Sequence, residues 1–73
     1  MSVSISFGQV QRMLEKCAPG YRIELKTHFR FVYLNAIVFP TLPKHDNIEV
    51  GHIKKMARTL GILDCAKGFL GIK

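Results

Sequence analysis

The N-terminal part of the chain has the hydrophobic pattern of an amphipathic helix from Ser6 to Cys17. Its apolar residues recur at spacings of three and four, which places them on one helical face: Phe7, Val10, Met13, Leu14 and Cys17. Ser4 or Ser6 can cap the start of this helix. Pro19-Gly20 then ends the helix and turns the chain.

Three segments typical of β-strands follow the turn. Tyr21 to Lys26 alternates apolar and charged residues, which indicates a half-buried strand. After a break at Lys26-Thr27, His28 to Leu34 is rich in aromatic and branched residues, and Ala36 to Leu42 has the composition of a third strand. Asn35 suits a tight turn between the last two strands. Connections this short require antiparallel pairing.

The middle strand has apolar residues on both of its faces. We expect the aromatic face, formed by Phe29, Phe31 and Tyr33, to lie in the core. The run also resembles an RNA-stacking strand motif, but it lacks the glycine of that motif. In the third strand, Pro40 indicates a strand end or a sheet edge.

A second amphipathic helix is predicted from Val50 to Leu60, after a loop from Pro43 to Asn47. Gly61 is suited to end this helix. The tail from Ile62 to Lys73 is expected to form a short closing turn of helix. The apolar stripe of the second helix consists of Ile53, Met56, Ala57 and Leu60.

These elements predict a single α+β domain over residues 1–73, in the order helix-strand-strand-strand-helix. Both helices have an apolar stripe to bury, so we expect a two-layer fold with both on one face of a three-stranded antiparallel sheet. A chain of this length buries only about 60% of its unfolded surface. Its apolar share of 48% is nevertheless enough for a core and excludes a disordered chain.

Charge changes this picture by indicating a partner. Eleven lysines and arginines against five acidic residues give a formal net charge of +6. Such an excess on a small domain creates a positive surface field, which favours polyanions, above all nucleic acid. The alternatives are an acidic protein partner and a solvated basic surface without a partner.

The two cysteines, Cys17 and Cys65, are fewer than the roughly four to eight of small secreted scaffolds. We expect both thiols to be free and buried. The N-terminus does not resemble a signal peptide, and no apolar stretch approaches the roughly 20 residues of a membrane span. The expectation is a reduced, soluble, cytoplasmic protein without membrane contact.

His28 is the first candidate for chemistry, because it starts a strand between Lys26 and Arg30. A neutral imidazole there can act as general base on a ribose 2′-hydroxyl while the cations stabilise charge on the phosphate. The alternative is an exposed strand histidine without a role. His45, in the loop, either touches substrate or faces water, and His52, in the first turn of the second helix, is expected to serve solubility.

Lys54, Lys55 and Arg58 form a basic ridge on the second helix, which either follows a phosphate backbone or is simply the solvated helix face. No metal site is predicted, since the histidines and cysteines show neither C-x-x-C nor H-x-x-x-H spacing. A Walker sequence and a G-x-G-x-x-G run are absent from the sequence, so no cofactor is predicted.

Several short phrases, taken in order, resemble the HicA family of small bacterial toxins, which are messenger-RNA interferases. The family's Gly-Ser-His element and aromatic strand correspond to Lys26-Thr27-His28 and Phe29-Arg30-Phe31, and its Val-Pro-x-His phrase to Leu42-Pro43-Lys44-His45. Its first helix corresponds to Met13 to Lys16, and its Ile-x-x-Gly-x-Leu-x-x-Ile helix entry to Ile48 to Met56. The similarity covers roughly residues 8 to 63. Lysine stands at position 26 where the family has glycine, which adds charge but removes backbone freedom.

The resemblance implies a fold similar to double-stranded-RNA-binding domains and metal-independent RNA cleavage, with His28 in the place of the catalytic histidine. It implies messenger RNA as substrate and a HicB-like antitoxin as protein partner. On this hypothesis the groups that hold RNA phosphates are Lys26, Thr27, Arg30, Lys54, Lys55 and Arg58, with His45 as an accessory. A non-catalytic RNA-binding module of the same fold, or a basic protein for an acidic partner, are the alternatives.

Overall fold

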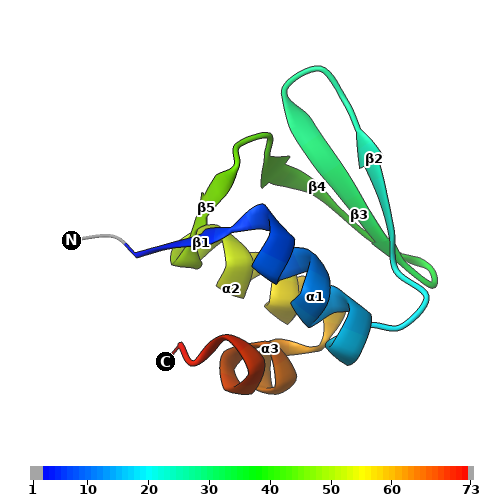
Figure 1. Ribbon diagram of the computed structural model, residues 1–73. Coiled ribbons are helices and arrows are strands. Elements are labelled where there is room, and N and C mark those ends of the chain that lie inside the picture. Colours follow the sequence, from blue (N-terminus) through cyan, green and yellow to red (C-terminus); the bar gives the residue numbers. More distant parts are fainter. Residues whose placement is uncertain (1–2, 73) are drawn as a thin grey trace.

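The computed structural model describes residues 3–72, with elements in the order β1, α1, β2, β3, β4, β5, α2, α3. The strands are β1 (Ser4–Ser6), β2 (Arg22–Leu25), β3 (Phe29–Leu34), β4 (Ile37–Pro43) and β5 (Asn47–Glu49). The helices are α1 (Phe7–Cys17), α2 (Val50–Leu60) and α3 (Leu63–Leu70). β3 is the middle strand of an antiparallel sheet with β2 and β4, and β1 pairs with β5 in a separate two-stranded sheet. The helices lie on one side of the three-stranded sheet (Figure 1), so the predicted α+β class and sheet are confirmed.

Both predicted amphipathic helices are present with nearly the predicted bounds. α1 begins after Ser6, whose hydroxyl accepts a hydrogen bond of 3.3 Å from the backbone N–H of Gln9. α2 ends at Gly61, which has a left-handed φ of 76° and donates its N–H to the carbonyls of Ala57 and Arg58. Glycine is favoured there because a side chain would strain this backbone conformation.

The core lies between the sheet and the helices. It contains the predicted stripes of α1 and α2, together with single residues of β5 and α3. The sheet contributes Val32 from β3 and Phe39 and Leu42 from β4. The buried helix residues are Val10, Met13, Leu14, Ile53, Met56, Ala57 and Leu60.

The prediction that Phe29, Phe31 and Tyr33 face the core is wrong, because β3 presents its other face to the helices. Val32 is fully buried, whereas Phe29 is 43% exposed and Phe31 and Tyr33 are half-buried. Side chains alternate across a strand, so Phe31 and Tyr33 lie on the face opposite Val32. This outer face also carries Arg22 and Glu24, the β2 partners of Tyr33 and Phe31.

An irregularity in the β3–β4 pairing explains how Phe39 and Leu42 share one face although they are three residues apart. Val32 pairs with Phe39 and Arg30 with Leu42, so β4 advances by three residues while β3 advances by two. The extra residue makes a bulge at Pro40-Thr41, which is a position where proline is tolerated. β4 is also an edge strand, as Pro40 predicted. Asn35, with a left-handed φ of 56°, turns the chain between β3 and β4 as expected.

The segment predicted as a loop from Pro43 to Asn47 is shorter in the structure. Pro43 ends β4, and Asn47 begins β5, which pairs with β1 in the register Ser4 to Glu49, Ile5 to Ile48 and Ser6 to Asn47. Strands of three residues carry too few positions for an alternation to be visible. The pairing places Ile48 in the core and fixes the segment directly before α2.

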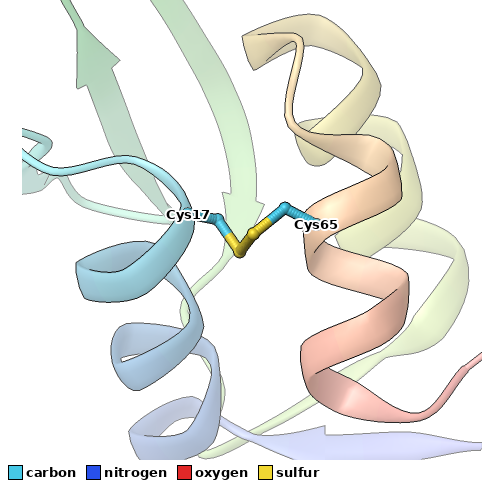
Figure 2. Close-up of a disulfide and its surroundings, with 2 residues drawn as sticks. All are labelled: Cys17 and Cys65. Atoms are coloured by element: carbon cyan, nitrogen blue, oxygen red, sulfur yellow. A yellow bond between two sulfur atoms is a disulfide. The ribbon is translucent and has the colours of Figure 1, made fainter.

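The expectation of free, reduced cysteines is also wrong. Cys17 at the end of α1 and Cys65 in α3 form a disulfide with an S–S distance of 2.07 Å and a Cα–Cα distance of 5.7 Å (Figure 2). The tail is an eight-residue helix rather than a single closing turn, and it packs against both α1 and α2. That packing brings Cys65 to Cys17 across 48 positions of sequence, a proximity that neither local pattern reveals.

Within residues 3–72, the structure has no helix with the length and apolar character needed to span a membrane.

Candidate functional site

The hairpin tip Lys26-Thr27-His28 joins β2 to β3 and extends beyond the layer of helices (Figure 1). The backbone N–H of Lys26 donates to the carbonyl of Phe29 at 2.9 Å, which closes the tip. Thr27 and His28 are exposed. No hydrogen bond within the described part of the chain holds the His28 imidazole, so the ring is accessible to a ligand in solution.

Lys26 turns back along the outer face of the sheet. Its Nζ lies 3.3 Å from Oε1 of Glu24 and 5.4 Å from the centre of the Phe31 ring. Next to it, the Arg22 guanidinium lies 4.7 Å from the centre of the Tyr33 ring. These five side chains form an outer sheet cluster: Arg22, Glu24, Lys26, Phe31 and Tyr33.

The outer sheet cluster is organised around the Glu24 carboxylate. Tyr33 donates its hydroxyl hydrogen to Oε1 of Glu24 at 2.9 Å. This hydrogen bond and the neighbouring Lys26 ammonium lower the pKa of Glu24 below its ordinary value. The same hydrogen bond raises the pKa of Tyr33, because the phenolate could not donate. The carboxylate of Glu24 therefore partly offsets the positive charge of Lys26 on this face of the sheet.

Arg30 lies on the opposite face of β3 from Lys26, on the side of the helices. Its guanidinium stacks on the ring of Phe7 at 3.7 Å from the centroid. It also donates from Nη1 to the carbonyl of Pro43 at 2.8 Å and to the carbonyl of His45 at 3.0 Å. Arg30 thus ties the start of β3 to the first turn of α1 and to the loop after β4. The two cations predicted to flank His28 together lie on different sheet faces.

A pocket of about 280 Å³ lies beside the hairpin tip, where β3 begins and β4 ends. Phe29 and Pro43, which pair across the two strands, form one side. His45 and His52 both line it, although the sequence places one in a loop and the other in the first turn of α2. We call this the histidine pocket. Its lining is Phe29, Pro43, His45, Asn47, Ile48, Glu49 and His52.

The basic ridge of α2, formed by Lys54, Lys55 and Arg58, lies apart from the lining of the histidine pocket. Lys54 is half-buried and Lys55 and Arg58 are exposed. Arg58 lies six residues after His52, about 9 Å further along the helix axis, and lines a different hollow beside the disulfide, with Asp64 among its neighbours. Among residues 3–72, no hydrogen bond or ion pair links these three cations to the hairpin tip.

Metal-ligating side chains do not converge in the described ranges. Residues 3–72 contain no group of three or more histidine, cysteine, aspartate or glutamate side chains placed to hold a metal ion. His45, His52 and Glu49 all line the histidine pocket, but they are not placed to bind one metal ion together.

The sequence indicates binding or catalytic roles for His28 and His45 but none for Phe29, Glu49 or His52. Phe29 was assigned to the core because it belongs to the aromatic alternation of β3. Glu49 and His52 are brought to His45 by the β1–β5 pairing, which turns the chain into α2 at this point. The available signal is the occurrence of two histidines seven residues apart with two acidic residues, Asp46 and Glu49, between them.

Comparison of the chain with family profiles, with curated proteins and with solved structures finds no match.

Proposed function

We propose that the chain is a metal-independent endoribonuclease of the HicA toxin type, with the double-stranded-RNA-binding-domain-like version of its α+β fold. The observation that carries this proposal is the exposed His28 on a closed hairpin tip of a domain with a net charge of +6. A basic domain attracts RNA, and an imidazole without an internal partner is free to approach a ribose.

In the proposed reaction, a ring nitrogen of His28 removes the proton from a ribose 2′-hydroxyl. The 2′-oxygen attacks the adjoining phosphorus and the bond from phosphorus to the 5′-oxygen breaks, which leaves a 2′,3′-cyclic phosphate and a 5′-hydroxyl. Water supplies the proton to the departing 5′-oxygen. Thr27, on the same tip, and Lys26, once it leaves Glu24, are the nearest groups along the chain to hold the phosphate. Lys54, Lys55 and Arg58 attract the flanking strand.

The partners follow from this function. The substrate is messenger RNA, and a HicB-like antitoxin, which is an acidic protein in this proposal, covers the active face until it is removed. The proposed location is the cytoplasm, where messenger RNA is found, although a disulfide such as Cys17–Cys65 is rare in that reducing compartment.

The test is incubation of purified protein with single-stranded RNA in excess chelator, with His28→Ala as the matched variant. His28 is exposed, so the substitution leaves the core intact. We expect fragments ending in 2′,3′-cyclic phosphate from the wild type and a loss of roughly 100-fold or more in rate for the variant, which is the usual size of general-base catalysis. An RNA with 2′-deoxyribose at the cleaved positions should stay intact. Equal cleavage by wild type and variant overturns the role of His28.

A second candidate, a non-catalytic RNA-binding module, is favoured by the positions of Lys26 and Arg30. Lys26 is paired with Glu24, and Arg30 is held by Phe7 and two carbonyls, so neither stands free beside His28. This candidate predicts binding that weakens steeply with salt and RNA that stays intact after long incubation. Cleavage that is lost in the His28→Ala variant rejects it.

A further inference from the structure

We propose that the histidine pocket binds one unpaired RNA base, stacked on Phe29, and that Glu49 makes guanine the preferred base. This inference rests on the proposed function for its biological substrate, since it assigns the base next to the attacked phosphate. The pocket itself is argued from its own geometry.

Backbone groups around the histidine pocket are held by hydrogen bonds within the protein. On one side, Arg30 holds the carbonyls of Pro43 and His45 at 2.8 and 3.0 Å. On the other side, the N–H of Phe7 donates to the carbonyl of Asp46 at 2.7 Å, and the N–H of Val50 donates to the carbonyl of Val3 at 2.9 Å. A pocket whose loops are already ordered loses little conformational entropy when it binds.

Size and shape favour a single planar ring system. The volume of about 280 Å³ lies just below the range of about 300–1,000 Å³ for pockets of drug-sized ligands. Its interior is closed by Ile48, which is 1% exposed. Phe29 is 43% exposed, so its ring offers a surface for stacking. Proteins that read single-stranded RNA stack its bases on such aromatic side chains.

The polar lining can read the edge of a base. His45, Asn47, Glu49 and His52 offer both donors and acceptors around one opening. A carboxylate accepts only, through two oxygens, so it best matches two adjacent donors. Guanine presents such a pair, N1–H and N2–H, on its Watson–Crick edge, whereas adenine and cytosine present one donor beside an acceptor. Recognition by this edge requires an unpaired base.

The position of the pocket relates it to the proposed reaction. Phe29 directly follows His28 in the chain, so a base stacked on Phe29 places its nucleotide next to the hairpin tip. A guanine there would set the cleavage position in the RNA. His45 and His52, both exposed, lie together in the lining at this end of the sheet.

The test is titration of the protein with GMP, AMP, CMP and UMP, followed by amide chemical shifts in NMR spectra. We expect GMP to perturb residues of the pocket and to bind at least tenfold more tightly than AMP. Guanosine should bind nearly as well as GMP, and inorganic phosphate should not displace it. Displacement by phosphate, or equal binding of AMP and GMP, overturns the assignment to guanine, and the absence of pocket shifts with all four nucleotides overturns the pocket.

Two variants and one control sharpen the result. Phe29→Leu should weaken GMP binding about tenfold or more, because stacking is lost while an apolar side chain remains. Glu49→Gln should remove the preference for GMP over AMP. Phe69→Leu is the matched control, because Phe69 in α3 is 44% exposed, as Phe29 is, but does not line the pocket. An equal loss of binding in Phe69→Leu overturns the role of Phe29.

The same titrations in the His28→Ala protein separate the two proposals. Nucleotide binding at the pocket in both proteins, together with RNA that even the wild type leaves intact, supports the pocket and rejects the nuclease. RNA cleavage without detectable nucleotide binding supports the nuclease and rejects the pocket.

Discussion

Removing the disulfide between Cys17 and Cys65 should cost about 4 kcal/mol of unfolding free energy. The bond closes a loop of sequence separation 48. Loop-closure entropy gives about 3 kcal/mol for a 15-residue loop and about 4.7 kcal/mol for a 100-residue loop, so this loop falls between them. At about 0.05–0.15 kcal/mol per residue, a 73-residue domain has a total stability of roughly 4–11 kcal/mol. The bond therefore provides a large fraction of the total.

The assay is urea unfolding of the wild type and of a Cys17→Ala/Cys65→Ser variant, each with and without reductant. Reductant should destabilise the wild type to the level of the variant and leave the variant unchanged. Intact mass should show two hydrogen atoms fewer in the oxidised than in the reduced wild type. A loss below about 1 kcal/mol, or a reductant effect on the variant as large as that on the wild type, refutes the loop-closure reasoning.

Three further predictions concern single positions. Leu14→Ala should destabilise the domain by about 2–5 kcal/mol in urea unfolding, because Leu14 is fully buried; a loss under about 1 kcal/mol would contradict its place in the core. Gly61→Ala should lower the stability of the domain, because alanine is strained at a φ of 76°. Gly68→Ala in α3 should raise Tm, because a Cβ there meets open space and alanine adds about 0.5–1 kcal/mol of helix stability. The opposite order of the two Tm values would refute the assigned helix ends. Glu24 has a lowered pKa in the fold, so its contribution is present above its ordinary pKa and lost as pH falls through the folded value. Stability measured from pH 7 to pH 3 should therefore fall more for the wild type than for Glu24→Gln, and parallel curves would argue against the bond from Tyr33.

The helices could be predicted from the sequence because their patterns are local. Phe7–Cys17 and Val50–Leu60 each show an apolar period of three to four, Ser6 marks the start of the first helix, and Gly61 marks the end of the second. The small β1–β5 sheet could not be predicted, since three-residue strands show no period. The pairing of Cys17 with Cys65 depends on how α3 packs, which is a tertiary property.

The orientation of β3 was predicted wrongly for a physical reason. Both of its faces are apolar enough for a core, so alternation alone could not decide between Phe31 and Val32. The choice is made by β4, where the bulge at Pro40-Thr41 brings Phe39 and Leu42 to the same face as Val32. Arg30, on that face, is accommodated at the rim because it stacks on Phe7.

The candidate site is only partly visible in the sequence. His28 lies exposed on the hairpin tip, directly before β3 begins at Phe29, whereas the sequence pattern starts the strand at His28 itself. The expected grouping of Lys26 and Arg30 around His28 depends on their closeness in the chain. The two residues lie on either side of a turn, however, and their side chains point to opposite faces of the sheet. The histidine pocket depends on the β3–β4 and β1–β5 pairings together, so no single stretch of sequence contains it.

The bulge at Pro40-Thr41 also determines how this sheet could be extended by another chain. Proline has no N–H to donate and a bulge interrupts the regular spacing of backbone groups, so β4 is a poor template for an added strand. The opposite edge, β2, is regular over its four residues. A partner that extends the three-stranded sheet by strand addition is therefore expected to align with Arg22–Leu25. Polymerisation of this sheet through both edges is disfavoured at β4.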